Sequence, residues 1–259
     1  PFYGEAGGQV GDRGSMLGEG IELEVIDCTR HEDFILHHCR LKRGSVRSGV
    51  VLQAIVDRER RLSTMRHHTA THLLQYALRE VLGTHVEQSG SLVTPDRLRF
   101  DFSHFEPMKM DELAKVEEIV NRKIMENHPV KAYHTTLDEA RRQGVLAFFA
   151  EKYGDRVRVL QIGDFSKELC GGTHVSFTGE IGLFRILRET GIAAGIRRIE
   201  AVCGMKVLEL IKKEDELLRR LSEIVSAPRE DLETKVQSLQ RRIKELEREM
   251  ENLRRSLSK

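Results

Sequence analysis

Apolar and polar residues alternate along the first part of the chain, a pattern that is typical of β-strands. Ile21, Leu23 and Val25 are separated by two glutamates, so the three apolar side chains would share one face of a strand. A second apolar run covers residues 46–56, and glycines and polar turn residues separate the runs. We therefore predict a small antiparallel, barrel-like β unit over residues 1–62.

Residues 63–204 mix helical and strand patterns, which predicts an α+β domain. A long helix is expected from Met65 to Leu82, with Ser63 or Thr64 as its N-cap and Gly83 at its end. The remaining patterns predict a strand pair over 88–102 with a turn at 94–96, helices over 110–126 and 137–143, and strands over 157–162, 182–189 and 196–203.

Residues 205–259 have a helical pattern throughout, apart from a break at 226–228. Pro228 suits the first turn of a new helix. After it, apolar residues recur at alternating steps of four and three: Leu232, Val236, Leu239, Ile243, Leu246, Met250, Leu253 and Leu257. This heptad seam predicts either an intramolecular helical hairpin with the amphipathic segment 205–225 or an intermolecular coiled coil, which would make a homodimer.

Composition excludes several classes of protein. The chain has 259 residues, with 42 Lys+Arg against 41 Asp+Glu, and this balance argues against wholesale disorder and against a histone-like basic surface. No apolar run reaches the roughly 18–20 residues that span a bilayer, so no membrane partner is expected. The four cysteines are scattered, which is unlike a disulfide framework and favours a cytoplasmic protein.

Two short segments carry the candidate metal chemistry. His68 and His72 are four residues apart on the long predicted helix, so their imidazoles would share one face. Cys170 and His174 have the same spacing, and the two glycines between them permit a tight backbone wrap. One thiolate and three imidazoles form a set suited to tetrahedral Zn²⁺. Four protein ligands usually make a closed structural site, so the spacing leaves a catalytic or a structural role open.

Together with the opening segment PFYGEAGGQVGD (1–12), the HTATH and CGGTH segments resemble the editing region of alanyl-tRNA synthetases. Free-standing alanyl-tRNA editing proteins and, more distantly, the editing domain of threonyl-tRNA synthetase share this pattern. The segments QSGSLV (88–93), RFDFSH (99–104) and GIRRIEA (195–201) fit it as well. The resemblance covers nearly the whole chain. The first residue, Pro1, and the helical tail favour a segment of a synthetase over a free-standing editing protein.

The resemblance implies hydrolysis of the ester in mischarged Ser-tRNA(Ala) and Gly-tRNA(Ala), with the tRNA(Ala) acceptor end as partner and Zn²⁺ as cofactor. By the same resemblance, His68, His72, Cys170 and His174 match the family's zinc ligands, and Cys170 is essential to catalysis. Gln88 matches a pocket residue associated with editing. Thr69 matches a position beside the metal, within reach of the serine hydroxyl.

Three further residues are weaker candidates for contacts with tRNA. Gln9 ends a Gly-Gly-Gln sequence that also serves peptidyl-tRNA hydrolysis in release factors, although its glycines could simply permit tight turns. Arg197 and Arg198 could contact phosphate, but neighbours on a strand face opposite sides, so at most one would point into a given pocket. A structural zinc module that binds tRNA or oligomerises without hydrolysis is the alternative function.

The two arrangements of the helical tail differ in their hydrodynamics. If the tail folds back as an intramolecular hairpin, sedimentation equilibrium should report a monomer whose mass is independent of concentration. A mass that rises toward that of two chains as the concentration increases would instead favour the intermolecular coiled coil.

Overall fold

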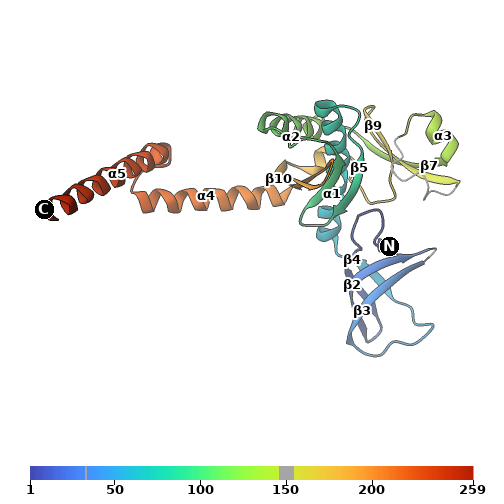
Figure 1. Cartoon of the computed structure of the whole chain (residues 1–259). Coiled ribbons are helices and arrows are strands. Elements are labelled where there is room, and N and C mark those ends of the chain that lie inside the picture. The colour runs from blue at the N-terminus through green and yellow to red at the C-terminus, as the bar shows by residue number, and fades with distance from the viewer. Residues whose placement is uncertain (33, 146–154, 259) are drawn as a thin grey trace. The chain divides into compact units, whose positions relative to one another are not determined.

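The computed structural model describes residues 1–32, 34–145 and 155–258, and these form two compact units, 1–207 and 208–259 (Figure 1). The first unit combines three antiparallel sheets with helices, as the predicted α+β class requires. The finer division of this unit into 1–62 and 63–204 stays a prediction.

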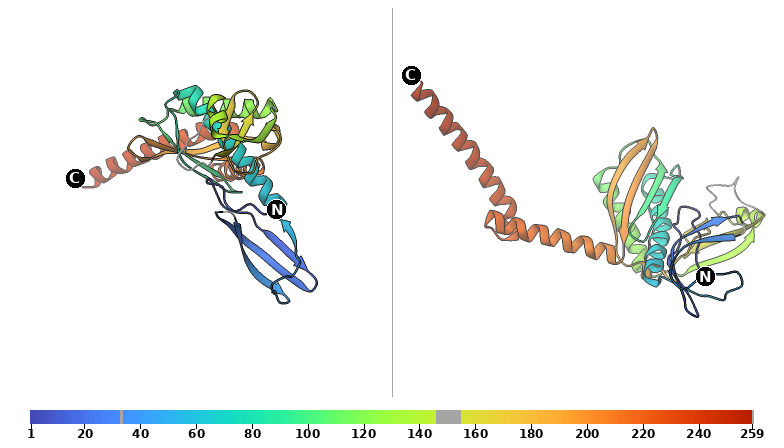
Figure 2. Two further views of the ribbon diagram at one scale, coloured as in Figure 1. Left: turned by 90° about the vertical axis from the view of Figure 1, so that its right-hand side faces the viewer. Right: turned by 90° about the horizontal axis from the view of Figure 1, so that it is seen from below.

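The N-terminal strands form one antiparallel sheet in the order β3-β2-β1-β4. Its members are β1 (Gly14–Gly18), β2 (Ile21–His31), β3 (Phe34–Arg43) and β4 (Gln53–Val56). β3 and β4 are its two edges, so the sheet is open and the barrel-like prediction is not confirmed. The left view in Figure 2 shows these strands as a sheet that extends from one side of the first unit.

The helix that carries two candidate ligands begins earlier than predicted. α1 (Arg58–Leu82) is capped by Asp57, whose Oδ1 accepts a hydrogen bond from the Arg60 backbone N–H at 3.0 Å. The prediction of a cap at Ser63 or Thr64 was therefore wrong. Thr64 lies inside the helix, where its hydroxyl donates to the Arg60 carbonyl one turn back. Gly83 ends the helix as predicted, with a φ of 114°.

α1 lies at the centre of the first unit, and its apolar side chains fill the core. It contacts α2 (Met110–Met125) and the sheet β10-β11-β6-β5, which comprises β5 (Gln88–Val93), β6 (Leu98–Ser103), β10 (Phe184–Ala193) and β11 (Ile196–Cys203). Leu73 and Leu74 of α1 and Phe100 and Phe102 of β6 are fully buried. This packing fixes the rotation of α1 and hence the direction of its histidines.

A third sheet, in the order β7-β8-β9, carries the second pair of candidate ligands at its end. It contains β7 (Val130–Thr136), β8 (Arg156–Ile162) and β9 (Ser166–Leu169), with the short helix α3 (Leu137–Arg142) after β7. A 3₁₀ turn, η2 (Thr178–Ile181), leads into β10. β9 contacts α1, which brings the end of this sheet to the helix.

The tail consists of α4 (Met205–Val225), the 3₁₀ turn η3 (Arg229–Asp231) and α5 (Leu232–Leu257), so the predicted break at 226–228 is confirmed. Within the second unit, α5 has no buried residue; Leu232 is half-buried, and the other seven heptad side chains are exposed. The predicted hairpin packing is therefore not seen, and the coiled coil stays a prediction. Across the described residues, no helix combines the length and the apolar character needed to cross a bilayer.

A buried carboxylate ties the N-terminal segment to α1. Asp12 is 4% exposed; it accepts a hydrogen bond from the Tyr3 N–H at 2.6 Å and forms an ion pair with Arg61. Replacing Asp12 with Ala removes both contacts and should lower the free energy of unfolding by about 1.5–3 kcal/mol. Urea unfolding measures this change.

Glu19→Ala is the matched control for Asp12→Ala, because Glu19 is an exposed carboxylate in the turn between β1 and β2. We expect the control to change the free energy of unfolding by less than about 0.5 kcal/mol. Equal stability of the two variants would show that Asp12 does not anchor the segment.

Candidate metal centre

Four side chains from two distant segments converge beside α1. His68 and His72 lie one turn apart on α1, Cys170 follows β9 directly, and His174 lies in the loop beyond it. Their potential ligand atoms all lie within 4.8 Å of one another. The structure thus brings together the four residues that the sequence predicts as a metal site.

Two of the donor–donor distances match the spacing around a tetrahedral metal. Sγ of Cys170 lies 3.4 Å from Nε2 of His68 and 3.2 Å from Nε2 of His174. Ligand atoms around tetrahedral zinc are separated by about 3.4 Å, given bonds of about 2.0–2.3 Å. Nε2 of His72 is buried and has no hydrogen-bond partner among the described residues. A metal ion bound to this donor set would satisfy that orphaned nitrogen, so the residues fit a metal.

Each imidazole is held through its Nδ1 atom by a different acceptor. His68 donates to Oε1 of Gln9 at 2.7 Å, His72 donates to Oε2 of Glu168 at 2.7 Å, and His174 lies 3.3 Å from Oγ1 of Thr69. A proton on Nδ1 leaves the lone pair on Nε2 free for a metal. The three acceptors therefore select the tautomer that turns Nε2 toward Cys170.

The loop from Cys170 to His174 lies close against α1 because Gly172 has no side chain. A Cβ atom at Gly172 would collide with the imidazole of His68. Arg158 of β8 holds the same loop, since its guanidinium donates to the carbonyl oxygens of Cys170 at 2.7 Å and Gly172 at 3.0 Å. Glycine is thus needed at position 172 so that the loop can approach His68 closely, as the sequence predicted from the glycines between Cys170 and His174.

The electrostatics of the metal-free cluster favour a thiolate. Burial raises the pKa of Cys170, but the three nearby imidazoles outweigh burial and hold this pKa well below its usual range. Burial lowers the pKa of His72, but Glu168 and Cys170 outweigh it and raise that pKa to about 10. Burial lowers the pKa of His174 to about 3. Thiolate and neutral imidazole are the forms that bind metal, so metal binding would displace the proton that Glu168 and Cys170 stabilise on His72.

Three of the four ligands, His68, His72 and Cys170, border an open cleft of about 580 Å³. Polar side chains from several elements line the same cleft: Tyr3, Arg30, Thr71, Gln88, Ser91, His134, Arg158 and Glu168. Gln88 donates from Nε2 to the Ser91 hydroxyl at 3.1 Å. A donor set in the wall of a cleft has room for a substrate beside it.

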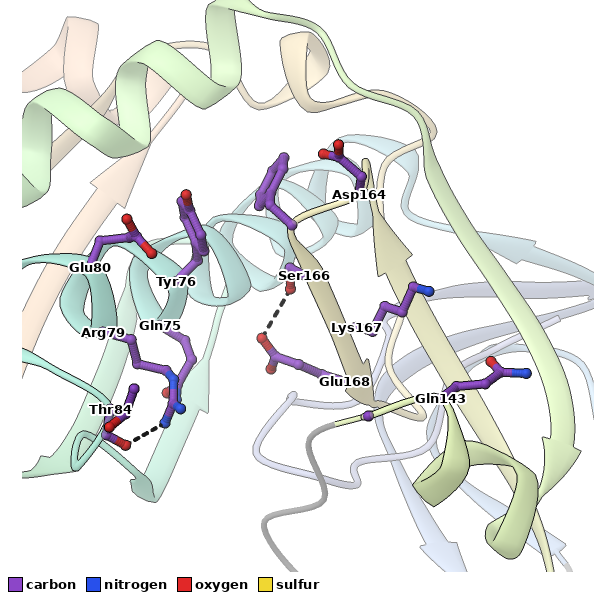
Figure 3. A pocket seen from close by; sticks show the side chains of 12 residues that line it. Gln75, Tyr76, Arg79, Glu80, Thr84, Gln143, Asp164, Ser166, Lys167 and Glu168 are labelled. Atoms are coloured by element: carbon purple, nitrogen blue, oxygen red, sulfur yellow. Dashed lines mark hydrogen bonds between the residues drawn. The ribbon is translucent and has the colours of Figure 1, made fainter.

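A second pocket, of about 480 Å³, borders Glu168 and is lined by Gln75 of α1 and Ser166 of β9 (Figure 3). The Ser166 hydroxyl donates to Oε1 of Glu168 at 3.1 Å, so both oxygens of this buried carboxylate have a partner. Gln75 is 1% exposed, and neither polar atom of its side chain has a hydrogen-bond partner among the described residues.

The structure places the other predicted site residues in different surroundings. Gln88 lies in the cleft, whereas Thr69 is fully buried and its hydroxyl donates to the Met65 carbonyl. Arg197 is paired with Glu189, and Arg198 with Asp101, each through two hydrogen bonds. The predicted roles of these residues stay predictions. Gln9 is buried against the metal ligands, as described above.

Sequence reasoning missed Glu168, although a signal was present. Ser166, Glu168 and Cys170 alternate along the chain, so they share one face of an extended segment. A glutamate two residues before a predicted ligand, on the ligand's own face, is a candidate partner for a neighbouring histidine. Arg158 carried no such signal, because its role depends on the pairing of β8 with β9.

Comparison with known proteins matches two parts of the chain to known families. Residues 157–200, which include Cys170 and His174, match the family model for the threonyl and alanyl tRNA synthetase second additional domain. Residues 1–60, which include Gln9, match the model for class II (A) tRNA synthetases. Three similar relatives are alanine–tRNA ligases: the chain is 56% identical to that of Carboxydothermus hydrogenoformans, 51% to that of Halorhodospira halophila and 53% to that of Shewanella loihica.

These alignments cover 83–84% of this chain and 25% of each relative. Over most of its length the chain is therefore similar to one region of the alanine–tRNA ligases. It spans about a quarter of the length of the ligases it matches. The matched second additional domain is named for both threonyl and alanyl tRNA synthetases. The resemblance to the alanyl-tRNA synthetase editing region, inferred from the motifs, is therefore confirmed.

The donor set predicts that this chain binds one zinc ion and that Cys170→Ala abolishes tight binding. The substitution removes the one thiolate, the donor that the surrounding imidazoles stabilise. Cys39→Ala is the matched control, because Cys39 is a free, exposed cysteine on β3. Metal analysis after dialysis should give about one zinc per chain for the control and much less for Cys170→Ala. Equal zinc content in the two variants would contradict the assignment.

Proposed function

We propose that this chain is an editing hydrolase for mischarged tRNA(Ala), acting with zinc in the cytoplasm. It would cleave the ester that joins serine or glycine to the terminal adenosine of the acceptor end. One observation carries the proposal: His68, His72 and Cys170 form part of the wall of a cleft that polar side chains also line. The match to a second additional domain of alanyl and threonyl synthetases supports it.

The physical need for such a site lies in the limits of a small binding pocket. A pocket shaped for alanine cannot exclude glycine by size, because glycine is smaller. It rejects serine only modestly, since one added hydroxyl gives limited discrimination. A separate hydrolytic site would remove the mischarged products that the first pocket admits. The chain matches a quarter of the ligases, and this part includes the second additional domain, which is a candidate for that site.

In this proposal His68, His72, Cys170 and His174 would hold the zinc ion. Zinc supplies a Lewis acid that polarises a bound oxygen or positions the aminoacyl group. Gln88 and Ser91, which share the cleft with the ligands, would orient the aminoacyl end by hydrogen bonds. Water then attacks the ester carbonyl, and the ribose oxygen leaves with a proton. Arg30, also in the cleft wall, places a positive charge where a phosphate could bind.

A structural zinc module is the second candidate, because a set of four protein ligands is typical of closed sites. Such a module would bind tRNA or oligomerise through α5 without hydrolysing an ester. The exposed heptad side chains of α5 favour a homodimer in that case. The position of the ligands in a cleft wall favours the hydrolase, since a closed site has no need of an adjoining cleft.

The hydrolase predicts deacylation of Ser-tRNA(Ala) by this chain, with Ala-tRNA(Ala) left intact. Cys170→Ala should lose the activity by at least 100-fold, whereas Cys39→Ala should retain it. Gln88→Ala should lower the rate by about 10-fold or more with zinc still bound, because Gln88 lies in the cleft and outside the donor set. The release of serine from labelled tRNA measures each rate.

The outcome separates the two candidates. A zinc-loaded, folded chain that binds tRNA and shows no hydrolysis at enzyme concentrations above that of the tRNA would establish the structural module. Hydrolysis that persists unchanged in Cys170→Ala would contradict the assigned centre. Equal cleavage of serine and alanine esters would contradict the editing role and leave a nonspecific esterase.

A further inference from the structure

Gln9 comes from the N-terminal segment, yet its side chain lies inside the metal centre. It is 1% exposed, and it ends the sequence Gly7-Gly8-Gln9. The sequence favoured turn-forming glycines or a contact with tRNA for this segment. A side chain so completely buried offers no surface to a polynucleotide, so its role must be sought in what it touches.

The carboxamide of Gln9 joins the two halves of the donor set. Its Oε1 accepts from Nδ1 of His68 at 2.7 Å and from the backbone N–H of Thr173 at 2.8 Å. Its Nε2 donates to the Thr173 hydroxyl at 2.9 Å. His68 is a ligand on α1, and Thr173 precedes the ligand His174 in the loop. One amide therefore connects the helix to the loop that carries the other two ligands.

The backbone around Gln9 is itself fixed, so the amide arrives at a set position. The N–H of Val93 on β5 donates to the Gly8 carbonyl at 2.7 Å, and the N–H of Val10 donates to the Val93 carbonyl at 3.1 Å. Gly8 has a φ of 84°, and a Cβ atom there would collide with Ser91. These constraints explain why glycine precedes Gln9.

We propose that Gln9 is a positioning residue of the metal centre, which acts through His68 and Thr173. Its Oε1 keeps the proton of His68 on Nδ1, so Nε2 faces the metal, and its bonds to Thr173 hold the loop at the distance that Cys170 and His174 need. The proposal rests on the metal assignment in the proposed function. It also means that the segment matched by the class II synthetase model completes the centre of the second additional domain.

The chemistry of the amide makes the proposal testable by substitution. Gln9→Leu keeps the size of the side chain but removes both the acceptor for His68 and the donor to Thr173. Gln9→Glu keeps the acceptor and removes only the donor. Gln53→Leu is the matched control, because Gln53 is an exposed glutamine on the edge strand β4 of the same N-terminal sheet.

The experiment measures zinc affinity by competition with a chromophoric chelator, on the full chain. Gln9→Leu should bind zinc 10–100-fold more weakly than the wild type, the range found for outer hydrogen-bond partners of metal ligands. Gln9→Glu should stay within a few-fold, and Gln53→Leu should be unchanged. The visible spectrum of the Co²⁺-substituted protein should change in Gln9→Leu alone, because the ligand geometry around the metal changes there.

Wild-type affinity and an unchanged Co²⁺ spectrum in Gln9→Leu would overturn the proposal. Equal loss in Gln9→Leu and Gln9→Glu would also overturn it, since the bond to His68 would then not matter. Far-UV circular dichroism checks that each variant folds. If Gln9→Leu does not fold, Gln9→Asn replaces it, because the shorter side chain withdraws the amide from His68. The same loss of zinc affinity is expected for Gln9→Asn. A wild-type chain that binds no zinc would instead contradict the metal assignment of the proposed function.

Discussion

An imidazole that binds a metal through one nitrogen must find an acceptor for the proton on the other, and this constraint organises the centre. The acceptors are an amide from the N-terminal segment, a carboxylate from β9 and a hydroxyl from α1 itself. Each buried acceptor is held in turn by its own neighbours. Thr173 fixes Gln9, Ser166 fixes Glu168, and the Met65 carbonyl fixes Thr69. The geometry of the donor set therefore depends on contacts one residue further out.

Burying so many polar groups beside an apolar core is costly unless each is paired. α1 illustrates the balance, because Leu73 and Leu74 pack into the core while His68 and His72 face the loop after β9. The rotation of the helix serves both needs at once. Any substitution that turned α1 would disturb apolar packing and the donor set together, which makes the centre sensitive to changes far from the ligands.

The sequence predicted the features that depend on local pattern. The long helix, the break before Pro228 and the four side chains that could hold a metal followed from periodicity and spacing. The start of α1 was missed because Asp57 caps the helix before the apolar pattern begins. β3 was missed because nearly all its residues are exposed, so no alternation marks it. The roles of Gln9 and Arg158 depend on which strands pair, and a single sequence does not state that.

The separation of the site residues along the chain has a consequence for folding. The bond from Gln9 to Thr173 joins residues 164 positions apart, and that from His68 to Cys170 joins residues 102 apart. Closing loops of this length costs entropy before any contact repays it, so such contacts form late. A ribosome would also release Gln9 and both helix histidines long before Cys170. Binding of a metal ion by all four side chains would thus be a late step of folding. It would require that the N-terminal segment, α1 and β9 have already assembled.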